Sequence, residues 1–210
     1  MGSSTGCQDI MEYLTGLGHE SRPAIDGGIL QAPASDRECF VMTMEPGLYN
    51  SSCVAAKKMV DEGNGEEILP KKETNNAPGP CTARRWLSLA SPNHDGDDDY
   101  FSSDLTDEQL LKTFGRLPER TKLCVLMSEN DEYVPKSIDK MGLIKRWTSI
   151  VKRGEGRIDE VNSGVVKGAS HNLGKDGDGE EIVKDLVRRV LGFLDGLPEK
   201  TMAKLGDEKL

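Results

Sequence analysis

The chain has 210 residues, of which 36% are hydrophobic and 30% are charged, a length that suits one domain and is enough to bury a core. Its 36 acidic and 27 basic residues give a net charge of -9, so it lacks the basic surface that nucleic acid or an anionic membrane requires. No apolar stretch reaches the ~18 residues that span a bilayer, and no signal peptide opens the chain. We therefore expect a cytoplasmic protein with no nucleic-acid or membrane partner.

The first motif is GSSTG, which begins at Gly2 and ends at Gly6 and fits the nucleophile-elbow pattern G-x-S-x-G. We expect both glycines to be required, because a side chain at either position would collide with backbone in the strained turn between strand and helix. The apolar spacing after the motif predicts a helix over 5–14. Ser4 would then lie at a helix N-terminus, with the Thr5 N–H group directed at a developing oxyanion.

A buried strand is predicted over 24–32, which is rich in aliphatic side chains and bounded by turn residues. The insertion that follows, 39–120, differs in kind. Helical patterns occur at 53–61 and 107–114, and the residues around them are dense in Gly, Pro, Asn and Asp, which predicts flexible loops. An ordered insertion of this length between two strands is usually functional, often as a lid.

The next predicted strand, 123–128, is followed directly by an acidic turn. A carboxylate at the C-terminal end of a parallel strand lies on the edge where α/β enzymes place their sites. Asp131 is the candidate acid, and Glu129 and Glu132 are the alternatives. The competing interpretation is a solvated acidic turn before the helix predicted over 136–151, whose N-terminal dipole favours negative charge.

The last predicted strand, 164–168, leads into a small-residue loop that contains His171. A lone loop histidine is more often a surface residue than a catalyst. A clear amphipathic helix over 182–194 follows, and a polar tail occupies 199–210. This alternation of strands and helices predicts an α/β fold with a parallel sheet.

The strongest evidence in the sequence is the combined position and order of three candidate residues. Ser4, Asp131 and His171 each lie where a predicted strand ends, and their chain order is the one that α/β-hydrolases use. His171 would take the proton from Ser4 as the hydroxyl attacks an ester carbonyl, and Asp131 would hold the imidazole in the correct tautomer. His19 and His94 fit no such role, because one follows the first helix and the other lies in an acidic loop.

No cofactor and no metal is expected. The five cysteines are an odd number without any C-x-x-C pair, which predicts reduced thiols rather than disulfides or a zinc site; they are Cys7, Cys39, Cys53, Cys81 and Cys124. The acidic run at 95–99 lacks the ligand spacing of a calcium loop.

Five segments together resemble a fungal and plant family of largely uncharacterised α/β-hydrolases that includes the fusarinine-type siderophore esterases: GSSTGCQDIMEYL, AIDGGILQAPASDRE, YFSSDLTDEQLLKTFG, SENDEYVP and GASHNL. The resemblance implies an α/β-hydrolase fold, a small-molecule ester substrate, Ser4 as nucleophile, Asp131 as acid and His171 as base. It also suggests that residues 100–111 belong to a cap over the site. The family commonly has histidine where this chain has Ser3.

In this fold the elbow serine follows the fifth strand of the sheet, so we expect an N-terminally truncated α/β-hydrolase with the strands before the elbow missing. The loop that donates the second oxyanion N–H group would be missing too, and losing one such donor costs on the order of 10²–10³ in rate. An open sheet edge predicts oligomerisation. Two hypotheses follow: a serine esterase, or a catalytically impaired fragment that acts, if folded, as an interaction module.

The predicted organisation has four parts. Residues 1–38 hold the elbow, its helix and the next core strand, and 39–120 form the cap-like insertion. Residues 121–198 form the C-terminal α/β core with the acid and the histidine, and 199–210 form the tail.

Overall fold

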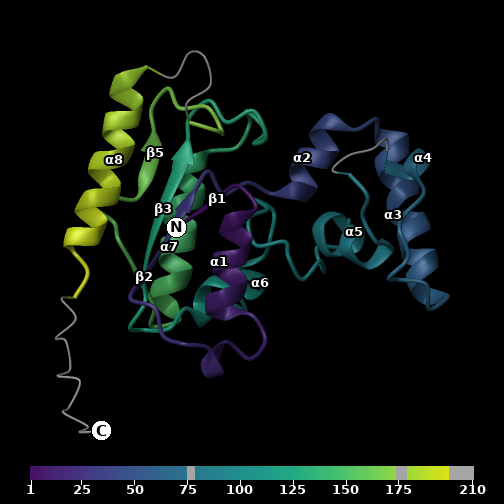
Figure 1. The fold of residues 1–210 in the computed structure, drawn as a ribbon, viewed down its shortest axis with the longest axis horizontal. Coiled ribbons are helices and arrows are strands. Elements are labelled where there is room, and N and C mark those ends of the chain that lie inside the picture. Colours follow the sequence, from purple (N-terminus) through teal and green to yellow (C-terminus); the bar gives the residue numbers. More distant parts are fainter. Residues whose placement is uncertain (75–78, 174–178, 199–210) are drawn as a thin grey trace, which may run out of the picture.

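The computed structural model describes residues 1–74, 79–173 and 179–198, so the predicted tail at 199–210 lies outside the described residues. A parallel sheet lies between helices, and a second group of helices lies to one side of it (Figure 1). The strands are β1 (Gly2–Ser3), β2 (Gly27–Gln31), β3 (Lys122–Ser128), β4 (Arg157–Ile158) and β5 (Gly164–Val166). The α-helices are α1 (Gly6–Thr15), α2 (Asp36–Thr43), α3 (Pro46–Asp61), α4 (Lys71–Thr74), α5 (Ala83–Ala90), α6 (Asp107–Leu111), α7 (Lys140–Arg153) and α8 (Glu180–Asp195). Two short 3-10 helices are η1 (His19–Ser21) and η2 (Phe114–Arg116).

Strand β3 is the centre of the sheet. It pairs with β2 on one side and with β4 and then β5 on the other, and β1 pairs with the far edge of β2, all in parallel. Because the strands are parallel, the C-terminal ends of β1, β3 and β5 reach the same edge of the sheet. The strand before the elbow was expected to be missing. The structure has a strand of two residues there, β1, which leads directly into Ser4.

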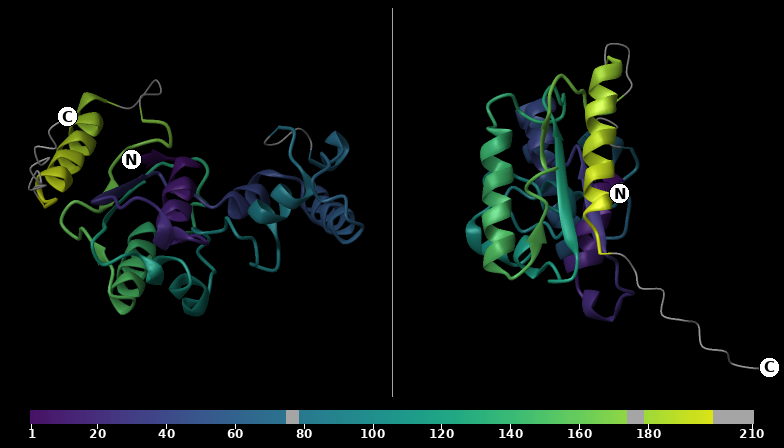
Figure 2. Two further views of the ribbon diagram at one scale, coloured as in Figure 1. Left: turned by 60° about the horizontal axis from the view of Figure 1, so that its bottom comes forward. Right: turned by 90° about the vertical axis from the view of Figure 1, so that its left-hand side faces the viewer.

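The two faces of the sheet are covered by different helices. Side chains of β3 alternate: Leu123, Val125 and Met127 pack with α1 and α7, whereas Cys124 and Leu126 pack with α8. This is the period-two alternation of a strand buried on both faces. Figure 2 shows α7 and α8 on opposite sides of the sheet.

The helices predicted over 5–14, 136–151 and 182–194 correspond to α1, α7 and α8. Helix α7 begins later than predicted because Asp139 is its N-cap and accepts the Gly142 N–H group at 2.9 Å. Helices α2, α4 and α5 and strand β4 were not predicted.

Helices α2 to α5 form a group with a core of its own, built around Trp86, which stacks on Phe40 with ring centroids 4.9 Å apart. The buried members are Phe40, Tyr49, Cys53, Ala56, Leu69, Cys81, Ala83, Trp86, Leu89 and Ala90. Arg37 at the start of α2 is buried and donates to Asp99 at 2.9 Å and to Asp104. This ion-pair network ties the helical group to the loop that returns to the sheet.

Residues 100–111 do not lie in that group, and the expectation that they belong to a cap is wrong. Phe101 and Leu110 are buried in the main core, where Phe101 packs edge-on against Trp147 of α7. Phe101 also packs edge-on against Phe114 of η2, so this segment belongs to the core beside α7. The capping box that opens α6, formed by Thr106 and Gln109, is present.

Helix α8 has a second apolar stripe next to the one that packs on the sheet. Val183, Val187, Leu191 and Leu194 are exposed on this stripe. Among the described residues, no helix has the length and apolar character that crossing a membrane requires.

Candidate active site

Ser4 occupies a strained turn between β1 and α1. Its φ of 54° lies in the left-handed region, which a serine rarely adopts. The turn is fixed by the Ser4 N–H group, which donates to the Gln31 carbonyl at 3.1 Å, and by the Cys7 N–H group, which donates to the Ser4 carbonyl at 2.9 Å. Such a turn lifts the serine side chain above the end of the sheet.

The two flanking glycines have different roles. A Cβ at Gly2 would lie 2.0 Å from the Gly6 carbonyl oxygen, so no side chain fits there. A Cβ at Gly6 would meet nothing within 4 Å among the described residues. The expectation that a side chain would collide at both glycines is therefore correct for Gly2 and wrong for Gly6. The tight contact is between the Cα of Gly2 and the backbone of Gly6, so a side chain is excluded at Gly2 alone.

The structure brings Ser4, His171 and Asp131 together from three strand ends. His171 Nε2 lies 2.8 Å from Ser4 Oγ, and His171 Nδ1 lies 2.8 Å from Asp131 Oδ2. His171 and Asp131 are only 3% and 5% exposed. An ionised carboxylate only accepts hydrogen bonds, so Nδ1 carries the proton and Nε2 is left to accept from the serine hydroxyl.

The acidic turn after β3 gives each of its side chains a separate partner. Asp131 Oδ1 accepts the Tyr133 N–H group at 2.9 Å. Glu129 instead accepts the Gly168 N–H group at 2.7 Å, and Glu132 accepts the His171 N–H group at 3.0 Å. Of the three candidate acids, only Asp131 faces the imidazole ring, and the other two bind the backbone of the histidine loop.

Two further side chains shape the surroundings of these groups. The Tyr133 ring lies edge-on to the His171 ring, with centroids 4.6 Å apart. Lys140 donates to the Ser128 and Glu129 carbonyls at 2.8 and 2.7 Å. Burial lowers the pKa of Lys140, against the opposing effect of the Asp131 carboxylate.

Thr5 is the N-cap of α1, immediately after Ser4. Its N–H group makes no hydrogen bond with any residue that the structure describes. It lies at the positive end of the helix dipole, where an anion is stabilised. This is the position at which the sequence predicted an oxyanion donor.

A cavity of about 460 Å³ opens in front of Ser4, a volume typical of small-molecule sites. It lies between the sheet edge and α2, and its lining is Ser4, Thr5, Gln8, Ala34, Ser35, Asp36, Cys39, Phe40, Thr43, Tyr133, His171 and Asn172. Gln8 donates to Asp36. Burial raises the pKa of Asp36, although the Gln8 hydrogen bond opposes the shift. The sequence did not single out Gln8 or Asp36, which lie in the first turns of α1 and α2.

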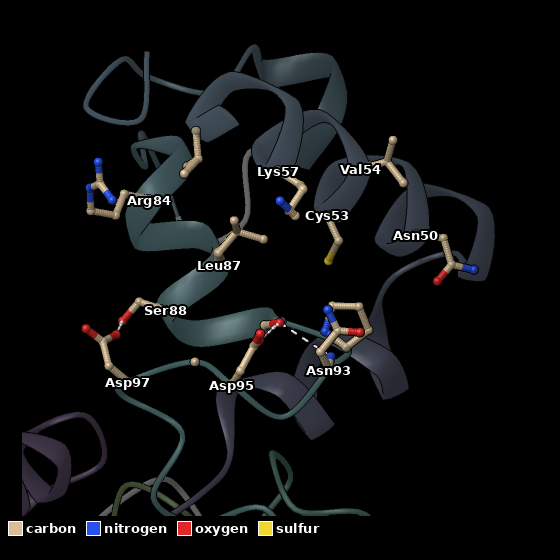
Figure 3. A pocket seen from close by; sticks show the side chains of 14 residues that line it. Asn50, Cys53, Val54, Lys57, Arg84, Leu87, Ser88, Asn93, Asp95 and Asp97 are labelled. Atoms are coloured by element: carbon tan, nitrogen blue, oxygen red, sulfur yellow. Dashed lines mark hydrogen bonds between the residues drawn. The ribbon is translucent and has the colours of Figure 1, made fainter. Parts of the chain in front are cut away.

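A second cavity, about 720 Å³, lies in the helical group. Figure 3 shows Cys53 and Lys57 of α3 facing Leu87 and Ser88 of α5 across it. Ser88 donates to Asp97. No histidine is among the described residues that line this cavity, and its other serine, Ser91, donates to the Asp95 carboxylate.

The remaining candidates are elsewhere. His19 Nδ1 lies 3.0 Å from the Gly16 carbonyl, and His94 lies beside Asp104. All five cysteines are free thiols, and burial raises the pKa of Cys7 to about 12. In the described ranges, no group of three or more His, Cys, Asp or Glu side chains is arranged to hold a metal ion.

The parallel sheet and its elbow define an α/β-hydrolase fold, as predicted, and solved structures agree. The siderophore hydrolase EstB from Aspergillus fumigatus matches with a TM-score of 0.74 and 40% identity, over 93% of this chain and 65% of EstB. A thermostable carboxyl esterase from Bacillus coagulans matches with a TM-score of 0.51 and 16% identity, over 93% of this chain and 63% of the esterase. At this identity the match is evidence for the fold alone.

The chain belongs to the family described as protein of unknown function DUF1749, which it matches over residues 1–195. The fusarinine C esterase sidJ of Aspergillus fumigatus is 38% identical over an alignment of 235 residues, which covers 94% of this chain and 66% of sidJ. The family resemblance predicted from the sequence is thus confirmed. The chain spans about two thirds of the length of the curated relatives that it matches.

Proposed function

We propose that this chain carries the catalytic residues of a serine hydrolase that acts on carboxylic esters. The observation that carries the proposal is the hydrogen-bonded series from Ser4 through His171 to Asp131, with 2.8 Å at both contacts. The left-handed turn at Ser4 supports it, because strain of this kind is usually retained where function requires it.

The proposed chemistry is acyl transfer through an acyl-enzyme. His171 Nε2 takes the Ser4 proton as Oγ attacks the ester carbonyl carbon, and Asp131 stabilises the imidazolium that forms. When the tetrahedral intermediate collapses, His171 returns this proton to the leaving alcohol. A water molecule then attacks the acyl-enzyme, gives its proton to His171, and releases the acid while the proton returns to Ser4.

The Thr5 N–H group is the proposed oxyanion donor of this chain. Its position at the start of α1 adds the helix dipole to the hydrogen bond. A donor of this kind stabilises the transition state more than the ground state, because the carbonyl oxygen gains charge as the serine attacks.

The substrate class is proposed from two relatives, whose names describe a fusarinine C esterase and a siderophore hydrolase. We propose a siderophore ester for this chain too. We also propose that the helical group α2 to α5 is a cap over the site. This cap corresponds to the helical part of the insertion predicted at 39–120. Cys39, Phe40 and Thr43 of α2 support this role because they line the cavity in front of Ser4.

The direct test compares hydrolysis of 4-nitrophenyl butyrate by the wild type, Ser4→Ala and Ser51→Ala. Ser51 is an exposed serine of α3 and is the matched control. We expect Ser4→Ala to lose at least ~10³ in kcat, while Ser51→Ala keeps the wild-type rate. Equal rates in Ser4→Ala and the wild type would refute the proposal. Fusarinine C hydrolysis, followed by mass spectrometry, tests the substrate class separately.

A second candidate function is an interaction module without activity. The exposed apolar stripe of α8 favours it, since uncovered stripes of this kind mark contact surfaces. A folded wild-type protein that hydrolyses neither ester would favour this candidate over the first.

A further inference from the structure

Gln31, the last residue of β2, is a buried polar side chain with no role in the chemistry described above. It is only 5% exposed. Both ends of its amide are used: Oε1 accepts from the Ser3 hydroxyl, and Nε2 donates to the His171 carbonyl at 3.3 Å. Its own backbone carbonyl accepts the Ser4 N–H group at 3.1 Å. One residue therefore contacts both the turn that carries Ser4 and the loop that carries His171.

The sheet topology explains why such a link matters. Ser4 follows β1 and His171 follows β5, and β2 and β3 lie between these two strands. The ladders of the sheet therefore do not pair the two segments with each other. Gln31 stands at the end of β2, where its side chain can reach across this separation.

The backbone of His171 is held from two sides. Glu132 accepts its N–H group at 3.0 Å, and Gln31 donates to its carbonyl. Asp131 and Glu132 belong to the same turn after β3, so they fix the histidine relative to that strand. Within the described part of the chain, Gln31 is the hydrogen-bond partner of the His171 backbone that also contacts the Ser4 turn.

We propose that Gln31 is a positioning residue that sets the distance between His171 Nε2 and Ser4 Oγ. The proposal rests on the function proposed above, in which these two atoms exchange a proton. Gln31 touches neither atom: its side chain binds the His171 carbonyl on one side and the hydroxyl of Ser3, next to Ser4, on the other. An amide suits this position because one end must accept from a hydroxyl while the other must donate to a carbonyl.

Gln31→Met is the first test, because methionine has a similar length and volume but makes neither hydrogen bond. A misplacement of the reacting atoms by about 1 Å costs up to ~10² in rate. We expect kcat to fall about tenfold or more, with KM within about twofold of the wild type. Thr106→Ala is the control, because it removes a helix cap remote from the site and should leave kcat unchanged.

Gln31→Glu supplies a readout that a merely structural role would not move. The ionised glutamate has no donor for the His171 carbonyl, whereas the protonated acid again has one donor and one acceptor. The ratio of its kcat to that of the wild type should therefore rise as the pH falls through the pKa of this glutamate. A ratio that is constant with pH, together with an unchanged kcat in Gln31→Met, would overturn the proposal.

A measurement without turnover separates this proposal from the proposed function. The Nδ1 proton of His171 can be followed by NMR in the wild type, Gln31→Met and Thr106→Ala. A shifted or broadened signal in Gln31→Met alone would support positioning even if no ester were hydrolysed. Identical signals in all three proteins would refute it, whatever the activity of the wild type.

Discussion

The strained turn at Ser4 makes a quantitative prediction about stability. Ser4→Ala and Ser4→Gly both remove the hydroxyl and its contact with His171, and they differ in how well they tolerate a φ of 54°. A side chain in the left-handed region costs about 1–2 kcal/mol. Glycine avoids this cost. Its greater conformational freedom in the unfolded chain, however, lowers the stability of the glycine variant by about 0.4–1 kcal/mol. Glycine should therefore be favoured over alanine at this position by about 1 kcal/mol.

Thermal and urea unfolding of the two variants measure this difference. For a domain of this size, about 1 kcal/mol corresponds to a shift of roughly 2–4 °C in Tm. Neither variant should hydrolyse an ester, so the comparison is not affected by activity. An alanine variant as stable as the glycine variant would show that the turn is not strained, and the strain argument for Ser4 would then be wrong.

Three further predictions concern residues around the site. Gly2→Ala should destabilise the protein and abolish ester hydrolysis, because its Cβ would lie 2.0 Å from the Gly6 carbonyl oxygen, whereas Gly6→Ala should keep the fold; circular dichroism and an ester assay compare them. The raised pKa of Asp36 means that the folded protein binds this proton more tightly than the unfolded chain, so stability falls as the pH rises through the folded pKa. Asp36→Asn should therefore increase the free energy of unfolding near neutral pH and lose this advantage below the ordinary aspartate pKa; an equal effect in urea titrations at both pH values would contradict the shift. Arg37→Met should lower the free energy of unfolding by about 3–5 kcal/mol, because it leaves the buried Asp99 carboxylate without its cationic partner while the hydrogen bonds from Ser102 remain; a loss below about 1 kcal/mol in the same titration would show that the pair is not needed.

Much of the main core could be predicted from the sequence, because its elements carry strong local signals. The apolar period of 182–194 and the aliphatic run of 123–128 identify α8 and β3. Ser4, Asp131 and His171 could be predicted as neighbours because each follows a strand and parallel strands end at one edge. The structure places them within hydrogen-bond distance, and their catalytic roles stay a prediction.

Other features depend on contacts that no local pattern reveals. Gln31 ends an apolar strand and looks like an ordinary boundary residue, yet its amide reaches a loop 140 residues away. Residues 100–111 have polar surroundings in the sequence, but Phe101 is buried against α7. Strands β1 and β4 have two residues each and show no periodicity. These elements are set by tertiary packing, which sequence spacing does not encode.

The central claim is that Ser4 is a nucleophile activated by His171. Intact-mass spectrometry after treatment with a fluorophosphonate probe, followed by peptide mapping, tests it most directly. We predict one covalent adduct on the peptide that contains Ser4, its loss in Ser4→Ala, and much slower labelling in His171→Ala. Labelling of a different serine, or no adduct on the folded wild-type protein, would contradict the claim.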